Sequence, residues 1–299
     1  MTTPRRAEAT SLGRYYSHPV TGEQLISVTN ALSVGCAKPA LVPWAAKIAA
    51  EYAMDNLPSL VFRSRTQDRE ELRKEISRQV TVARDKAADF GSRVHALAEA
   101  HVLGTTLPEE DGDDQAHAFV KQYERFLTDF DIDIERDIEA TELTCANPGL
   151  GVAGTLDLIA SLPVDGFIPG MPVKVVRDVN DRGRILIDIK TSLTRPATSV
   201  YGEYALQLTA LRHMTEAWMP DDSIVKMPGV HGAAVLNLRR NTYELIPLPT
   251  GEPEWAAFKG CLALAKWMHG VGNDVTRGEY RPITPAGKYK PKRTRKAAA

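Results

Sequence analysis

The sequence predicts a mixed α/β protein, in which helices flank a central mixed β-sheet and a helical extension precedes it. Three observations lead to this class. The 299 residues are 43% apolar and 25% charged, which suffices for a buried core and excludes a disordered chain, a collagen or a coiled coil. Apolar residues recur at helical spacing through most of the first 130 positions. Segments with strand character follow, and one helical segment divides them into two groups.

Helical periodicity marks the segments that should cover the sheet. Pro39 and Pro43 stand near the start of the first, where proline is tolerated. Gly91 interrupts the second, so we expect a kink or break there, and Gly104 ends it. Asp113 lies in an acidic cluster that can cap the third. The predicted helices span residues 39–54, 66–103, 113–130, 199–219 and 254–268.

Turn residues separate the predicted strands. Asn147-Pro-Gly149 divides the first two strands of the core, and Arg239-Arg240-Asn241 forms a hairpin turn between the last two. A long polar connection holds one further short strand, Val173–Val176. The main predicted strands span residues 24–28, 138–145, 151–160, 184–190, 232–238 and 243–248. This pattern divides the chain into an N-terminal β-turn and helical extension (1–84), an α/β core (85–270) and a basic tail without fixed structure (271–299).

The net charge of −1 conceals two halves of opposite sign. Residues 1–150 carry 17 basic and 24 acidic side chains, whereas residues 151–299 carry 20 and 14. A basic half indicates a surface for an anionic partner. The tail run Lys288–Lys296 has six Lys or Arg residues in nine and is either a solubilising segment or a transient contact for phosphate groups.

Sequence features also restrict the compartment. No run of eighteen apolar residues is present, so we expect no membrane span and no membrane partner. The first residues lack the apolar stretch of a secretory signal. Three widely spaced cysteines speak against a disulfide framework and for a reducing compartment, so we expect a cytoplasmic protein.

Three charged residues interrupt apolar strands and carry the strongest chemical signal. Asp157 lies in one strand, and Asp188 and Lys190 lie in the next. Residues two apart in a strand point to the same face, so Asp188 and Lys190 should lie side by side, with Ile187 and Ile189 opposite. Such charges are costly to bury unless paired or used, and a structural Asp–Lys pair is one interpretation. In the other, both carboxylates bind a hard cation such as Mg²⁺, and Lys190 positions the attacking water.

These motifs, in this order, resemble the PD-(D/E)XK nuclease superfamily. Gly154-Thr-Leu-Asp157, Asp188-Ile-Lys190 and a following helix with Gln207 carry the resemblance. More narrowly, the pattern is similar to RecB-type nuclease domains and the CRISPR-associated exonucleases that share them, including phage-encoded relatives. Those proteins place a histidine in a Gly-x-x-x-His setting before the first core strand, here Gly91-Ser-Arg-Val-His95. The resemblance covers residues 85–240, with weaker similarity in Ser27-Val-Thr29 and in the segment Lys38–Trp44, and implies a restriction-endonuclease-like core.

The resemblance also implies a role for each matching residue. Asp157 corresponds to the first metal-binding aspartate, Asp188 to the second acid, and His95 to the metal-proximal histidine. Lys190 corresponds to the catalytic lysine. Gln207 corresponds to the glutamine of a Gln-x-x-x-Tyr signature and, with Lys190, should contact DNA.

The chain departs from the family pattern in three places. Leu156 precedes Asp157 where proline is common, and the second acid is Asp188 rather than a glutamate. Leu211 stands where the signature has tyrosine, which leaves Tyr201 or Tyr204 to substitute or merely to pack.

Several neighbouring residues are expected to support the site. Glu142, on the adjacent strand, could act as a further acid, mainly in a supporting role. Thr191 and Ser192 are candidate phosphate or backbone contacts, and Tyr204 is a supporting aromatic. Arg239-Arg240 should be solvated at the hairpin turn, with a lesser alternative as a DNA contact.

The resemblance predicts a Mg²⁺-dependent DNA exonuclease of recombination, repair or end processing, in the cytoplasm of a bacterial or phage-infected cell, with Mn²⁺ able to replace Mg²⁺. The alternatives are a catalytically inactive DNA-binding module of the same fold and a restriction-type endonuclease. The family offers a recombination annealing protein as a further partner. Its iron–sulfur members need four cysteines and this chain has three, so no such cluster is expected.

Overall fold

The computed structural model describes residues 6–163 and 182–278. The predicted strand Val173–Val176 and residues 279–299 lie outside these ranges. The predicted absence of fixed structure from residue 271 onward is wrong for its first residues, because Val271–Thr276 form the helix α9. The fold is the predicted mixed α/β class, with an N-terminal helical region and a mixed sheet flanked by helices. Within the described residues, ten strands form one sheet, in which β3 pairs with β5 and β6 with β9 in parallel and all other pairs are antiparallel. The strands are β1 (Ala7–Thr10), β2 (Gly13–Ser17), β3 (Gln24–Ser27), β4 (Ile138–Asn147), β5 (Val152–Pro163), β6 (Arg182–Thr191), β7 (Glu216–Trp218), β8 (Ile224–Lys226), β9 (Gly232–Leu238) and β10 (Tyr243–Pro247).

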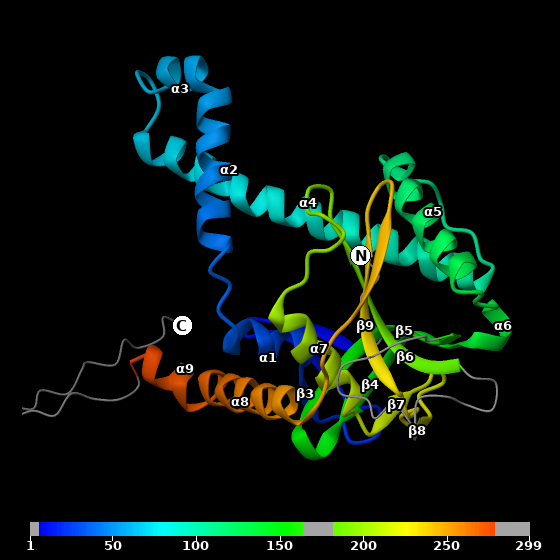
Figure 1. Ribbon diagram of the computed structural model, residues 1–299. Coiled ribbons are helices and arrows are strands. Elements are labelled where there is room, and N and C mark those ends of the chain that lie inside the picture. Colours follow the sequence, from blue (N-terminus) through cyan, green and yellow to red (C-terminus); the bar gives the residue numbers. More distant parts are fainter. Residues whose placement is uncertain (1–5, 164–181, 279–299) are drawn as a thin grey trace, which may run out of the picture.

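Helices cover both faces of the sheet (Figure 1). On one face, α1, α7 and α8 bury residues such as Leu32, Leu208 and Phe258 against the strands. On the other, α4 and α5 bury Val94 and Phe119. The helices are α1 (Val28–Gly35), α2 (Leu41–Asp55), α3 (Leu57–Arg63), α4 (Arg69–Leu103), α5 (Asp113–Asp129), α6 (Ile134–Asp137), α7 (Gly202–Arg212), α8 (Glu252–His269) and α9 (Val271–Thr276).

Strand β5 branches the sheet and so determines where the site lies. One edge of β5 pairs with β4 along its length, from Val152 to Ala160. The other edge pairs first with β3, through Val152 and Ala153, and then with β6, from Leu158 onward. In the described structure neither β3 nor β6 pairs with residues 154–157. The sheet therefore opens a notch at this edge of β5.

Helix α4 is one continuous helix of 35 residues, so the predicted break at Gly91 is wrong. A side chain on Gly91 would lie 3.2 Å from Thr191 Oγ1, which shows that this glycine permits a close approach of α4 to the end of β6. The ends of the helix follow ordinary capping: Asp68 accepts a hydrogen bond from the Glu70 amide, and Gly104 adopts a left-handed conformation.

The remaining differences concern segment ends and long-range pairing. The helix predicted at 199–219 ends at Arg212, because the chain then pairs Glu216–Trp218 with β4 and buries Trp218. The hairpin of β9 and β10 is confirmed. The proposed boundary at residue 84 falls inside α4, and β3 from the N-terminal segment joins the sheet, so residues 1–84 are not a separate extension. Among the described helices, none is long and apolar enough to cross a membrane.

An ion pair fastens α4 to the start of α5. Arg93 Nε donates to Asp113 Oδ1 at 2.8 Å, and a second guanidinium nitrogen lies 2.5 Å from Oδ2. Both side chains are largely buried, at 14% and 7% exposure. The Arg93 guanidinium lowers the pKa of Asp113 to about 2.

We expect Asp113→Asn to lower the free energy of unfolding by about 2 kcal/mol, because it leaves the Arg93 charge without its partner. Since the folded pKa lies below the unfolded value of about 4, the stabilisation is present above pH 4 and lost as the pH falls toward 2. Urea unfolding from pH 2 to pH 7 measures both effects. The control substitution Asp114→Asn, at a neighbouring exposed residue, should change neither the free energy of unfolding nor its pH dependence. Equal stability of the two variants at pH 7 would contradict the account.

Candidate active site

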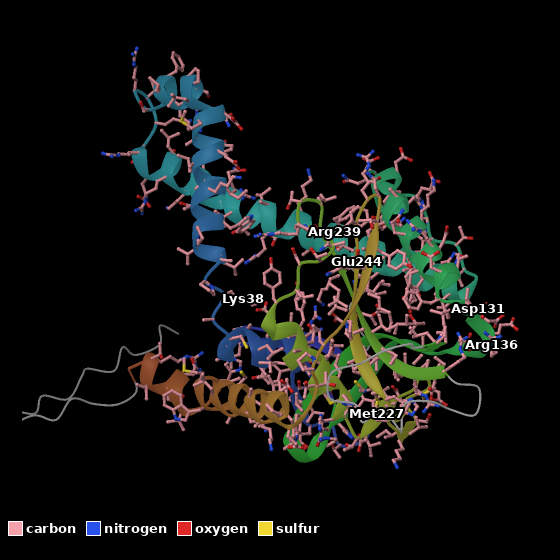
Figure 2. The ribbon with its side chains drawn as sticks, in the orientation of Figure 1. Lys38, Asp131, Arg136, Met227, Arg239 and Glu244 are labelled. Atoms are coloured by element: carbon pink, nitrogen blue, oxygen red, sulfur yellow. The ribbon has the colours of Figure 1, made fainter. Side chains whose placement is uncertain are left out.

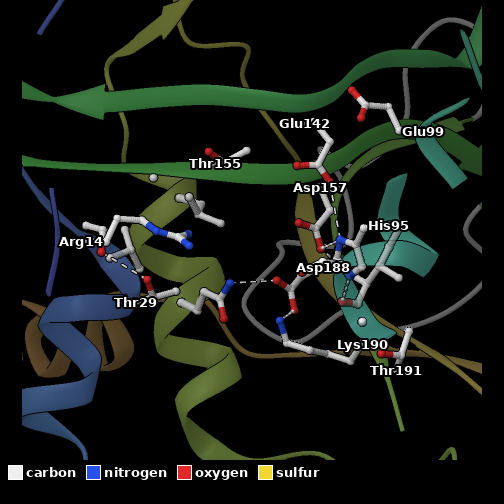
Figure 3. A pocket seen from close by; sticks show the side chains of 18 of the residues that line it. Arg14, Thr29, His95, Glu99, Glu142, Thr155, Asp157, Asp188, Lys190 and Thr191 are labelled. Atoms are coloured by element: carbon white, nitrogen blue, oxygen red, sulfur yellow. Dashed lines mark hydrogen bonds and ion pairs between the residues drawn. The ribbon is translucent and has the colours of Figure 1, made fainter. Parts of the chain in front are cut away.

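The notch beside β5 opens into a pocket of about 390 Å³ (Figure 3). Most of its charged and polar lining comes from five elements: α4, β4, β5, β6 and α7. The main residues are His95, Glu99, Glu142, Asp157, Asp188, Lys190 and Gln207, with Arg14 and Thr29 at the side of β2 and α1. The predicted catalytic and metal-binding residues therefore line one cavity, although His95 and Gln207 lie 112 positions apart in the chain. Thr191 lines it too, whereas Tyr204 and Ser192 do not.

Two side chains provide the backbone hydrogen bonds that a neighbouring strand would otherwise provide at this edge of β6. Strand β6 pairs with β5 only as far as Ile187. The backbone amide and carbonyl of Ile189, two residues further along, therefore have no hydrogen-bond partner on β5. The Ile189 amide donates to Asp157 Oδ2 at 2.7 Å, and the Ile189 carbonyl lies 3.0 Å from His95 Nε2. Because buried backbone groups need partners, these bonds fix the positions of both side chains.

The bond to Ile189 also fixes the tautomer of His95. A carbonyl oxygen can only accept, so Nε2 carries the proton and donates it. The other ring nitrogen, Nδ1, faces Glu142 Oε1 at 3.5 Å and Asp157 Oδ2 at 3.8 Å. Potential ligand atoms of His95, Glu142 and Asp157 all lie within 4.8 Å of one another, so these three side chains could hold one metal ion.

Glu142 reaches this cluster through an unusual backbone. The register places it opposite Asp157, since its neighbours Thr141 and Leu143 pair with Leu158 and Leu156. Its φ of 46° is in the left-handed region, which costs about 1–3 kcal/mol for a residue other than glycine. Sequence reasoning gave Glu142 a supporting role; the geometry groups it directly with His95 and Asp157.

Burial and charge shift the pKa values in opposite directions. Burial raises the pKa of Asp157 above its usual range, and Glu142 adds to this effect, although His95 and Lys190 oppose it. Burial lowers the pKa of His95, but the carboxylates of Asp157 and Glu142 outweigh it and raise the pKa to about 9. At neutral pH the positive charge of protonated His95 thus balances the negative charge of Asp157 and Glu142. A bound metal cation could provide the same balance.

Asp188 lines the same pocket, and its role as a metal ligand stays a prediction. Its carboxylate lies beside Lys190 Nζ at 2.6 Å and accepts a hydrogen bond from Gln207 Nε2 at 2.9 Å, and it is outside the three-residue cluster. The side-by-side placement of Asp188 and Lys190 is confirmed, with Ile187 and Ile189 packed on the opposite face. Burial lowers the pKa of Lys190, but Asp188 and Asp157 outweigh it, so the net pKa is raised and the ammonium keeps its proton at neutral pH.

The supporting residues divide into two groups. Thr191 lines the pocket beside Gly91, and the Tyr204 ring lies 5.2 Å from the Lys190 ammonium, a cation–π distance. Ser192 instead accepts hydrogen bonds from the amides of Thr194 and Arg195 within a turn.

The predicted solvation of Arg239 is wrong. This side chain is buried and donates to the carbonyls of Arg195 and Pro196, at 2.6 and 2.9 Å, because the connection from β6 to α7 folds over it. Arg240 is exposed, as the hairpin turn predicts.

Sequence reasoning gave no role to several polar and charged pocket residues, among them Glu99 and Arg14. Glu99 lies four residues after His95 on α4, so helical spacing could have placed both on one face. Arg14 enters from β2, and no local signal connects it with the rest of the site. Thr29 enters from α1 and belongs to the segment Ser27–Thr29, which carries the weaker N-terminal part of the resemblance.

No protein-family model and no curated protein matches the chain. Among solved structures, the chain is similar to one described as the crystal structure of SSO0001, with 16% sequence identity and a TM-score of 0.28, over 82% of this chain and 75% of that one. Similarity at this level does not identify a function.

We expect the cluster to bind one divalent cation, with Mn²⁺ as the probe. Glu142→Gln and Asp157→Asn should each weaken binding at least tenfold in calorimetric titration, because each removes a charged ligand. The matched control is Glu124→Gln, which alters a second His–Glu contact, 3.5 Å from His101 Nδ1, that does not line the pocket. Equal affinity in all three variants would refute the site.

The affinity for Mn²⁺ should also depend on pH. A ligating imidazole must be neutral, so binding displaces the His95 proton, and affinity should rise about tenfold per pH unit from pH 7 to about 9. His95→Asn should bind more weakly and lose most of this pH dependence. A slope in that variant as steep as in the wild type would assign the proton to another group.

Proposed function

We propose that this protein is a metal-dependent nuclease that hydrolyses phosphodiester bonds at DNA ends, in recombination, repair or end processing. The observation that carries the proposal is one pocket with two adjacent sets of groups. His95, Glu142 and Asp157 form a cation-binding cluster, and Asp188 holds Lys190 and Gln207 beside it. The likeness of these motifs to the PD-(D/E)XK nucleases supports the same reaction.

The donor set fits Mg²⁺ or Mn²⁺. Two carboxylates supply the hard oxygen ligands that Mg²⁺ requires, and the Nδ1 atom of a neutral His95 suits Mn²⁺ as well. When bound, the ion would lower the pKa of a coordinated water and neutralise charge on the phosphate. Glu142 and Asp157 would hold it, with His95 positioned by the Ile189 carbonyl.

Lys190 is suited to stabilising charge and not to removing a proton. Its raised pKa keeps the side chain cationic at neutral pH, and its contact with Asp188 aims it into the pocket. An ammonium in this position can orient the attacking water and interact with the developing charge on the phosphate oxygens. Gln207 fixes the other oxygen of Asp188 and so restrains the same carboxylate.

Lys190→Ala should lower the rate of Mg²⁺-dependent DNA hydrolysis at least about a hundredfold, because the transition state loses a fixed positive charge. Release of labelled nucleotides from linear duplex DNA measures the rate. The control Arg240→Ala removes an exposed cation from the β9–β10 turn and should retain wild-type activity. A fully active, folded Lys190→Ala protein would exclude the proposed role.

The form of the DNA substrate tests the action at ends. We expect linear DNA to be degraded with Mg²⁺ while closed circular DNA stays intact. Specific cutting of both forms would indicate an endonuclease, and binding without cleavage would indicate an inactive DNA-binding module.

A further inference from the structure

A helical arm projects from the body of the protein (Figure 1). It consists of α2, α3 and the N-terminal half of α4, and we define it as residues 41–82. In the described structure none of the fifteen residues of α2 is buried, although most are apolar. Val42 is 75% exposed and Met54 69%, and Phe62 of α3 is 70% exposed. Figure 2 shows the side chains of α2 projecting from the arm, away from the body of the protein.

Helix α2 has two apolar stripes on opposite sides. The inner stripe, Trp44, Ile48 and Tyr52, is half-buried on the side of α4, where the Tyr52 hydroxyl donates to Glu75 Oε1 at 2.7 Å. The outer stripe is displaced from it by two residues, about 200° around the helix. It consists of Val42, Ala46, Ala50 and Met54, all exposed. An exposed apolar stripe of this length normally marks a contact with another protein surface.

We propose that the outer stripe is the interface of a symmetric dimer, in which α2 packs antiparallel against α2 of a second copy. The stripe has small residues at its centre and larger ones at its ends. A twofold axis near residue 48 places Ala46 against Ala50 of the second copy and Val42 against Met54. Small central side chains let two helices approach closely, and a twofold interface must be complementary to itself. This proposal does not depend on the nuclease activity.

Charge on the flank of the stripe favours the antiparallel arrangement. Lys47 and Glu51 lie along one side and pair with each other at 3.4 Å, both largely exposed. The twofold axis brings each Lys47 within one helical turn of Glu51 of the second copy. A parallel pair would instead place the two flanks on opposite sides of the contact, so that neither Lys47 would meet Glu51 of the second copy. The stripe itself carries no charge, so it lacks the basic side chains that a DNA backbone requires.

Sedimentation equilibrium over a range of protein concentrations tests the interface. We expect the wild type to dimerise, and Ala50→Arg to weaken dimerisation at least about tenfold by placing two cations in the contact. Ala50→Ser is the matched control and should dimerise like the wild type. At a protein concentration low enough to keep all three proteins monomeric, circular dichroism should show unchanged melting for both variants, since residue 50 is exposed. A wild type that stays monomeric, or an Ala50→Arg protein that dimerises normally, overturns the proposal; the first result would leave the stripe to a different protein partner.

A charge exchange tests the antiparallel register. Lys47→Glu makes the flank wholly acidic and Glu51→Lys makes it wholly basic, so each variant alone should dimerise about two- to tenfold more weakly. An equimolar mixture should recover dimers, because each acidic flank then meets a basic one. This recovery cannot come from the contact between Lys47 and Glu51 within one chain, which is lost in both variants. A mixture no tighter than its components overturns the antiparallel arrangement.

Discussion

The site depends on the separation of β6 from β5 and on the two side chains that fill the gap. Where the strands part, the amide and carbonyl of Ile189 would remain buried without partners. Asp157 accepts from the first and His95 donates to the second. The same two bonds determine which oxygen and which nitrogen face the pocket, so the requirement to satisfy the backbone also positions the cation cluster.

The two charge sets in the pocket are linked through the same strand. Asp157 is anchored to the backbone of β6 between Asp188 and Lys190, and its charge acts on both His95 and Lys190. Glu142 and Asp157 therefore have a nearby cation in His95, and Asp188 has one in Lys190. A bound divalent ion would take over the compensation that the protonated His95 provides to Asp157 and Glu142, while Lys190 stays paired with Asp188.

Local patterns predicted the fold class and part of the site. Alternation along β6 sufficed to place Asp188 beside Lys190, because strand geometry alone decides it. Features set by distant contacts were missed or misjudged: Gly91 meets Thr191 instead of breaking its helix, and the role of Glu142 follows from its register with β5. The resemblance identified His95 as a site residue. Nothing near His95 in the sequence predicts that the Ile189 carbonyl orients its ring. Catalysis itself remains a prediction from chemistry and resemblance.

The most direct test of the central claim is a crystal structure grown with Mn²⁺ and examined by anomalous scattering. The account predicts one strong anomalous peak in the pocket, in contact with His95 Nδ1 and with carboxylate oxygens of Glu142 and Asp157, while His95 Nε2 keeps its bond to the Ile189 carbonyl. A pocket without a peak, or a peak bound by Asp188 and not by His95 and Glu142, would contradict it.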